Sequence, residues 1–422
     1  MKETANLPKI IKQIEEQSLR TWLISSLTQA FKEARKHKLK TFNEHAFEVN
    51  WNDNIIKLAD AIIEQIYKPS SSITFIVFDP MIREIFAAPF IDRVVHHLLY
   101  ELQGGWWDHR FIEDSYSCRE GKGTLYGVLR TWQMMRAATK GFTEEAFIIK
   151  LDIKGFFMSM PRKELFRIVK KGLKKQFAPY FGKSSAAFQL YRMCCFLWYQ
   201  ILMDNPIIHA HRRGKLSNWQ YLPPEKSLYC QPPDVGIVIG NLTSQLVSNI
   251  YLNRLDRYIK YDLKYRYYGR YVDDFFIIVP KSQYAQAKRD VKKIEKFLKE
   301  KLYLTLHPKK RYYQSVYKGV QFLGVRIYPH CLYPSNRLQK KFNHTMHRLY
   351  IGDESLKLET IISYFGQLKH LHGDKYVHRV FAKYELDYAL YLKTQNPETH
   401  SVKAIVNEIV AHGKGKGKNK KK

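Results

Sequence analysis

Cysteine is scarce in this sequence, and long apolar runs are missing. The five cysteines stand at positions 118, 194, 195, 230 and 331, with no Cys-x-x-Cys pair and no metal-ligand spacing. An odd, scattered set indicates reduced thiols in a cytoplasm rather than a disulfide framework. No uninterrupted apolar run reaches the roughly 18–20 residues that a membrane span needs. The first four residues include an acid and no apolar signal-peptide core. We therefore expect a cytoplasmic protein.

Positive charge is what the chain has in excess. Its 422 residues include 70 Lys and Arg against 39 Asp and Glu, a formal net charge of +31. Such a charge repels itself unless a polyanion neutralises it, so nucleic acid or an anionic membrane face is the expected partner. A hydrophobic fraction of 45% with 14% aromatic residues allows a packed core. A wholly disordered or fibrous chain is therefore excluded.

Hydrophobic periodicity divides the chain. Residues 10–68 show the three- and four-residue apolar spacing of helices. Short β-branched and aromatic runs predict strands at 73–78, 146–153, 267–279 and 319–328. Helical stretches are predicted between them, at 90–102, 163–173 and 244–261. This alternation favours an α+β or α/β core. A helical, basic region follows, and the last ten residues contain only Gly, Lys and Asn, which predicts a solvated tail.

Two adjacent carboxylates give the strongest chemical signal. Asp273 and Asp274 lie between apolar runs, which predicts a β-hairpin with acid at its tip. Asp-Asp is not a preferred turn pair, and neighbouring carboxylates repel one another unless a cation neutralises them. Mg²⁺ takes such oxygen ligands and keeps sites for phosphate. A solvated acidic turn is the plain alternative, but the flanking apolar strands favour the metal.

A third carboxylate, Asp152, stands near the end of another apolar strand. A lone Asp at a strand end is usually a turn or a helix cap. Three aspartates on two neighbouring strands, however, could hold two cations about 3.5–4 Å apart, as in two-metal phosphoryl transfer. We therefore predict that the catalytic residues are Asp152, Asp273 and Asp274.

A glycine-containing segment, Val235–Gln245, lies between the two acidic strands. Gly240 allows the backbone to approach a ligand closely. Thr243 or Ser244 can cap the helix that is predicted to start near Ser244. Most helices begin in a similar way, so this segment gains weight only from its position between the acidic strands.

In this order, the motifs over about residues 75–330 resemble those of a reverse transcriptase. Asp152 matches the first palm aspartate, and Tyr271–Asp274 matches the Tyr-x-Asp-Asp motif. The remaining matches are a primer grip at Phe322, Leu323 and Gly324, and fingers segments at Arg83–Ile85, Asp92–Val95 and Ser117–Thr124. The resemblance implies an α+β right-hand polymerase, in which helices flank an antiparallel palm sheet.

The resemblance also implies a set of site residues. The metal ligands would be Asp152, Ile153, Asp273 and Asp274, holding two Mg²⁺ ions with Mn²⁺ as a substitute. The nucleotide-binding residues would be Arg83, Arg119, Phe157, Ile239, Gly240, Gln245 and Lys310. Phe157 matches an aromatic gate against the ribose 2′-hydroxyl, although a Phe-Phe pair is more often core. Lys310 matches a lysine near the leaving pyrophosphate, although a basic strand end would look the same. Met81 replaces a lysine that related enzymes have, which leaves triphosphate binding to the two arginines.

The subgroup is indicated by Ile239–Gln245. An aliphatic residue before the glycine, and Ser-Gln in place of Ser-Pro, are similar to the enzymes of diversity-generating retroelements. Those enzymes copy a template-repeat RNA with errors at adenines, and the cDNA diversifies a variable protein gene. The implied partners are template RNA, cDNA or primer, dNTPs and a small basic helical accessory protein that forms an oligomeric barrel. A defence-associated, group II intron or retron enzyme remains the alternative. The three aspartates argue against an inert RNA-binding protein.

The expected organisation follows from these matches. Residues 1–72 form a helical amino-terminal segment, 73–330 the fingers and palm, 331–412 a basic helical thumb, and 413–422 a disordered tail. In the thumb, the cations that could follow a phosphate backbone are Arg337, Lys340, Lys341 and Arg348. A merely solvated basic face is an equal alternative.

Overall fold

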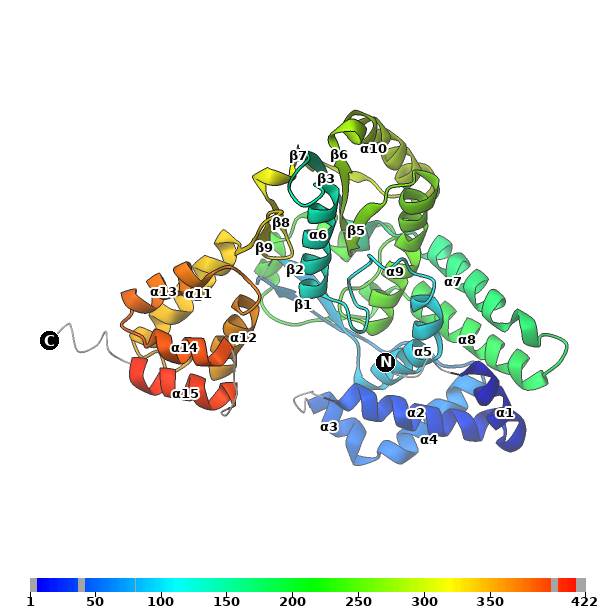
Figure 1. Ribbon diagram of the computed structural model, residues 1–422. Helices are drawn as coiled ribbons and strands as arrows, with labels where there is room; N and C mark the ends of the chain where they lie inside the picture. Colours follow the sequence, from blue (N-terminus) through cyan, green and yellow to red (C-terminus); the bar gives the residue numbers. More distant parts are fainter. Residues whose placement is uncertain (1–5, 37–41, 80, 396–400, 415–422) are drawn as a thin grey trace. The chain divides into compact units, whose positions relative to one another are not determined.

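The computed structural model describes residues 6–36, 42–79, 81–395 and 401–414 (Figure 1). The chain divides into two compact units. The first comprises Met1–Gly123, Lys150–Phe276 and Gln286–Arg311, and the second Thr124–Ile149, Ile277–Ala285 and Tyr312–Lys422. Residues 73–330 contribute to both units. Within the described ranges, no helix is both long and apolar enough to cross a membrane.

The amino-terminal part of the first unit is helical, as its apolar spacing predicts. Its helices are α1 (Leu7–Gln17), α2 (Leu19–Arg35), α3 (Phe42–Val49) and α4 (Trp51–Ile63). The Ser18 hydroxyl caps α2 by accepting from the Thr21 amide. Helix α2 packs on α4 and on the long helix α5 (Phe90–Asp108). Buried rings join these helices, since Phe31 contacts both Phe47 and Phe90.

A small three-stranded sheet follows these helices. Strand β1 (Ile73–Val77) pairs antiparallel with β2 (Arg83–Ala87) and parallel with the short β4 (His211–Arg212). The register places Arg83 opposite Val77, at the start of β2. The predicted strand at 73–78 is thus confirmed, and β2 and β4 were not foreseen.

The larger sheet carries the acidic motifs. Its strand order is β5 (Tyr267–Tyr271), β6 (Asp274–Pro280), β3 (Ala146–Ile153) and β7 (Leu306–Ser315). Strand β3 has the predicted bounds, and the predicted run at 267–279 forms the β5–β6 hairpin. The first unit also contains α7 (Arg162–Phe177), α8 (Ser185–Met203) and α9 (Leu242–Arg257), which ends in a π-helical turn, Tyr258–Asp262. Helix α9 packs against α5 and α7.

The second unit begins with α6 (Thr124–Ala138), and its largest part is the carboxy-terminal segment from Tyr312 onward. A three-stranded sheet has the order β10 (Leu332–Pro334), β9 (Val325–Ile327), β8 (Val320–Phe322). Its helices are α11 (Asn336–Tyr350), α12 (Leu358–Leu368), α13 (Asp374–Lys383), α14 (Tyr388–Gln395) and α15 (Val402–Gly413). Helix α10 (Lys281–Leu302) starts in this unit and ends in the first. Of the predicted tail, Gly413 belongs to α15, and residues 415–422 lie outside the described residues.

Short 3₁₀ turns complete the connections. They lie at Phe156–Ser159, Ala178–Tyr180, Pro206–Ile208, Leu216–Tyr221, Pro224–Lys226, Leu228–Cys230 and Val316–Lys318. Four of them occupy the stretch between α8 and α9, which is fixed to the first unit by a buried carboxylate. Glu84 of β2 accepts hydrogen bonds from Trp219 Nε1 at 2.7 Å, Ser227 Oγ at 3.0 Å and the Leu228 amide at 2.6 Å. This long connection is therefore an ordered part of the fold.

Candidate active site

Three aspartates meet where β3 and β6 lie side by side. The Ile153 amide donates to the Asp273 carbonyl at 3.1 Å, which joins the end of β3 to the turn before β6. Burial, and then the negative charge of Asp152, raise the pKa of Asp273 to about 6. Burial also raises the pKa of Asp274, against the opposing charge of Lys150. The structure thus brings together the three residues predicted to be catalytic.

Two lysines neutralise part of this negative charge. Lys310 Nζ lies 3.1 and 3.0 Å from the two carboxylate oxygens of Asp152, and Lys150 Nζ lies 2.8 Å from Asp274 Oδ2. The strand β7 places Lys310 beside Asp152, which agrees with its predicted location in the site. Lys150 was not singled out from the sequence, although its position two residues before Asp152 on β3 puts both side chains on one face.

The donor set fits a hard divalent cation. Asp274 Oδ1 is buried and accepts no hydrogen bond in the described part of the chain, an unfavourable state for a carboxylate oxygen. Mg²⁺ binds such oxygens. No three His, Cys, Asp or Glu side chains of the described residues are already arranged as a metal site, and lysines instead contact both carboxylate oxygens of Asp152 and Oδ2 of Asp274. Ile153 has a hydrocarbon side chain, so only its backbone carbonyl could serve as the predicted ligand.

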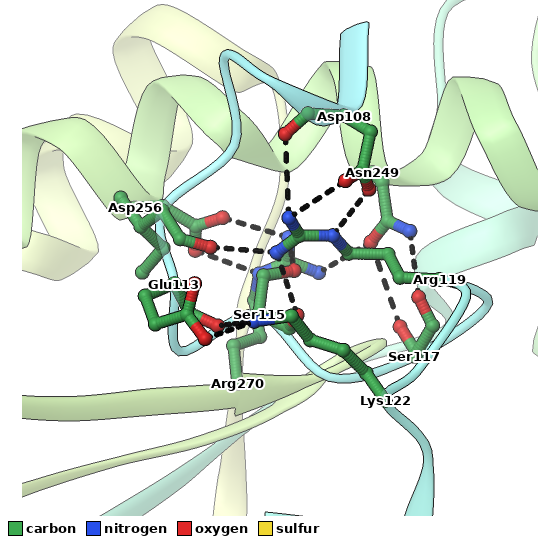
Figure 2. A network of polar contacts seen from close by, with 10 residues as sticks. Asp108, Glu113, Ser115, Ser117, Arg119, Lys122, Asn249, Asp256 and Arg270 are labelled. Atoms are coloured by element: carbon green, nitrogen blue, oxygen red, sulfur yellow. Dashed lines mark hydrogen bonds and ion pairs between the residues drawn. The ribbon is translucent and has the colours of Figure 1, made fainter. Parts of the chain in front are cut away.

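The turn between β5 and β6 is held by a buried polar network (Figure 2). Arg270 and Asp256 are both fully buried, and the guanidinium donates to the two carboxylate oxygens at 2.7 Å each. Arg270 also donates to the backbone carbonyl of Val272 at 2.9 Å. Sequence reasoning missed this pair. The only signal was an arginine inside an otherwise apolar hairpin.

Phe157 and Ile239 belong to one apolar cluster. Both half-buried side chains pack against the buried residues Phe86, Met158 and Leu228. The Phe86 amide donates to the Ile239 carbonyl at 3.1 Å, so β2 fixes this segment. The predicted gate residue and the predicted fidelity residue are therefore neighbours of the same cluster, although they are 82 positions apart in the sequence.

The start of α9 differs from the prediction. The helix begins at Leu242, and its N-cap residue Asn241 makes no side-chain cap bond. Thr243 does not cap the helix, because its hydroxyl lies 3.0 Å from His96 Nδ1. Gly240 (φ +131°) approaches the backbone of β2 rather than open space, since a Cβ there would lie 3.0 Å from the Phe86 carbonyl oxygen. Gln245 is exposed on the first turn of α9.

The two fingers arginines have different surroundings. Arg83 is exposed. Burial raises the pKa of Tyr271, the first residue of the Tyr-x-Asp-Asp motif, and the positive charge of Arg83 partly offsets that rise. Arg119 is 5% exposed. All five of its N–H groups are used within the chain, by Asp108 and by the carbonyls of Asp108, Ile112 and Ser115 (Figure 2). Arg119 therefore has no N–H group left for a triphosphate in this arrangement. Met81, two residues before Arg83, is exposed.

The remaining predicted residues lie in the second unit. Phe322 is buried at the end of β8, and Leu323 (φ +50°) with Gly324 (φ +85°) forms the two-residue turn to β9. On α11, Arg337 and Lys340 are exposed, whereas Lys341 is half-buried. Arg348 is half-buried and donates to Asp353 and to Ser355 at 2.7 Å each. The predicted set of four cations is thus divided.

Comparison with known proteins agrees with this architecture. Residues 81–327 match the family model for reverse transcriptase (RNA-dependent DNA polymerase), which is more than half of the chain. The α+β fold, with two aspartates at its antiparallel β5–β6 hairpin, is consistent with the right-hand polymerase architecture of that family. The chain belongs to the reverse transcriptase family. No curated protein matches it.

Solved telomerase structures are also similar. Apo telomerase from Candida tropicalis has a TM-score of 0.44 and 12% identity, over 82% of this chain and 64% of that chain. Telomerase from Candida albicans with a fragment of telomeric RNA has a TM-score of 0.37, with the same identity and coverage. This chain therefore spans less than two thirds of either telomerase chain.

Proposed function

We propose that this protein is an RNA-directed DNA polymerase. The observation that carries the proposal is the meeting of Asp152, Asp273 and Asp274 where the end of β3 lies beside the start of β6, and burial there raises the pKa of both hairpin aspartates. Membership of the reverse transcriptase family supports RNA as the template. The net charge of +31 supports a nucleic-acid substrate of either kind.

The residues of the site have distinct tasks in this proposal. The three aspartates, with the Ile153 carbonyl, would hold two Mg²⁺ ions, for which Mn²⁺ can substitute. When bound, the ions supply charge stabilisation for the attacking 3′-hydroxyl and the leaving pyrophosphate. Lys310 now contacts Asp152. A cation at that carboxylate would release the ammonium group, which could then neutralise or protonate the pyrophosphate. Phe157 would exclude a ribose 2′-hydroxyl from its side of the apolar cluster.

Within the family, we propose the mutagenic enzyme of a diversity-generating retroelement. Ile239 supports this, because a half-buried aliphatic side chain beside Phe157 offers a nucleotide no hydrogen bond. The enzyme would copy a template-repeat RNA in a bacterial or phage-infected cytoplasm. A small basic accessory protein would bind with it, and the RNA would bridge the two positive proteins. A defence-associated or group II intron-like or retron-like enzyme is the second candidate, favoured by the same catalytic residues.

Primer extension separates these proposals. The full chain would be given an RNA template, a DNA primer, dNTPs and Mg²⁺, and the products would be sequenced. An excess of errors opposite adenine is expected for the retroelement enzyme, and evenly distributed errors would support the second candidate. No DNA product with any primer would contradict polymerase function. Co-purification of the accessory protein with and without ribonuclease tests that partner, and failure to associate in both cases would remove it.

A further inference from the structure

The turn that carries Asp273 has a strained backbone. Val272 adopts a positive φ of +54°, a conformation that is sterically unfavourable for a β-branched residue. It stands between Tyr271, the last residue of β5, and Asp273, just before β6. Strain of this kind persists only where surrounding contacts impose it. At Val272 these contacts are made to the backbone amide and carbonyl.

Both polar groups of the Val272 backbone are held by side chains. The Val272 amide donates to Ser117 Oγ at 3.1 Å, and Arg270 Nη1 donates to the Val272 carbonyl at 2.9 Å. Ser117 belongs to the loop after α5, and Arg270 belongs to β5. Two separate segments, the loop and β5, therefore hold the two peptide groups that flank the Val272 Cα.

The two holding residues are themselves fixed by the network in Figure 2. Arg270 uses all five N–H groups, since it also bonds Asp256 twice, Asn249 at 3.3 Å and Ser115 at 3.0 Å. Asn249 in turn donates to the Ser117 carbonyl at 2.8 Å. The loop, α9 and β5 are thus connected through fully buried groups, and neither holding residue can move without breaking several bonds.

We propose that Ser117 and Arg270 are positioning residues, which hold Val272 in its left-handed conformation so that Asp273 and Asp274 face Asp152 before a cation arrives. The inference rests on the proposed polymerase function for its consequence, but its geometry does not depend on that function. Removing either contact would let the turn relax toward a negative φ and carry the two carboxylates out of place. A residue without strain at position 272 would need no such hold.

A double-mutant cycle between positions 117 and 272 tests the inference. Ser117→Ala would be made with Val, Ala and Gly at position 272, because glycine adopts a positive φ without cost. With Val272, we expect Ser117→Ala to lower kcat at least about tenfold and to raise the Mg²⁺ concentration for half-maximal rate. The KM for dNTP and the affinity for RNA should change less than twofold. With Gly at 272 the effect of Ser117→Ala should fall below about twofold, with Ala intermediate.

Ser115→Ala is the matched control. Ser115 is equally buried on the same loop and bonds Arg270, whereas the backbone groups of Val272 bond Ser117 and Arg270. Its effect should be the same with Val, Ala or Gly at position 272. Equal or larger effects of Ser117→Ala in the Gly background would overturn the inference, as would an unchanged kcat with Val272.

A readout without catalysis separates this inference from the proposed function. Hydrogen exchange of the 271–274 segment in the metal-free protein should be faster in Ser117→Ala than in the unaltered chain. Ser115→Ala, which removes only one of the five bonds of Arg270, should change it much less. If the unaltered chain makes no DNA but shows this difference, the polymerase proposal fails and the positioning inference stands. Equal exchange in the two serine variants would refute the positioning role even in an active polymerase.

Discussion

The two compact units differ in what they bury. Every buried Asp, Glu, His or Arg side chain of the described residues lies in the first unit, which also holds the aspartates proposed to be catalytic. These buried residues are Glu84, Asp92, His96, Asp114, Arg162, Asp256, Arg270 and Asp290. Among the described residues of the second unit, the buried Ser and Thr side chains are Thr131, Thr139, Ser335, Thr345 and Thr394, and no Asp, Glu, His, Lys or Arg side chain is buried. Its core is apolar and includes packed rings, with the Phe342 ring contacting Phe365 and Phe381.

This difference relates structure to task. Buried, fully bonded polar groups define one arrangement strictly, because any other leaves a charge without a partner. Carboxylates with the proposed task of holding cations would need such a fixed arrangement. A surface that follows a phosphate backbone of any sequence does not, so an apolar core with exposed cations is sufficient. The following changes test that contrast, from the largest expected effect to the smallest.

Asp273→Asn should have the largest effect. The change keeps the side-chain shape and removes one ligand charge, so we expect cDNA synthesis to fall by about a thousandfold or more. RNA affinity should stay within about twofold, because the binding cations are untouched. Primer extension and filter binding measure the two quantities. Asp234→Asn, at an exposed aspartate paired with Lys163, is the control and should retain activity. Substantial synthesis by Asp273→Asn would contradict the catalytic assignment.

Asp256→Asn and Phe342→Leu compare the two interiors directly. The first change is nearly isosteric but leaves the buried Arg270 without its counter-charge, which costs about 3–5 kcal/mol. The second removes part of a ring from an apolar core, which should cost about 1–2 kcal/mol, below the about 3–5 kcal/mol of a full Phe→Ala truncation. Denaturant unfolding of each variant measures both. If Phe342→Leu proves the more destabilising change, the buried polar contacts of the first unit do not make its interior less tolerant than the apolar interior of the second.

Acid should weaken the first unit through His96. Burial lowers the pKa of His96 to about 3 from an ordinary 6.5, so below pH 6.5 the unfolded chain binds a proton that the folded chain refuses. Stability therefore falls as the pH drops from about 6.5 toward 3, by about 2 kcal/mol between pH 7 and pH 5. Unfolding at both pH values checks this. His96→Gln should remove that part of the dependence, and His344→Gln, at an exposed histidine of α11, should not.

Much of the site was predictable because its signals are local. The bounds of β3 and the β5–β6 hairpin follow from short apolar runs, and the aspartates interrupt those runs. What was missed depends on distant partners. Glu84 bonds Ser227 and Leu228, and Thr243 bonds His96 instead of capping α9. Arg119 matched a motif, but its partners within the chain decide what its guanidinium can reach. Spacing along the sequence contains none of this information.

Cations on α11 should act on binding alone. Arg337 and Lys340 are exposed one helical turn apart, so changing both to Gln should reduce the slope of log affinity for RNA against log salt concentration by between about 1 and 2. Arg348→Gln is the control, since Arg348 pairs with Asp353 and should alter stability rather than the slope. Filter binding at several salt concentrations gives the slopes. Equal slopes in the double variant and the unaltered chain would make this face merely solvated.

The smallest expected effect concerns Ile239, where the polar character of the first unit is interrupted. Its side chain packs with Phe157 against an apolar cluster, so a mispaired nucleotide loses no hydrogen bond there relative to a correct one. Ile239→Gln would add an amide that can discriminate. A hydrogen bond contributes roughly 0.5–1.5 kcal/mol, so errors opposite adenine should fall by at most about tenfold. Sequencing cDNA from both proteins on one template, at matched synthesis rates, measures this. Equal error frequencies would show that Ile239 serves only the packing of β2 against its neighbours, and that fidelity is set elsewhere.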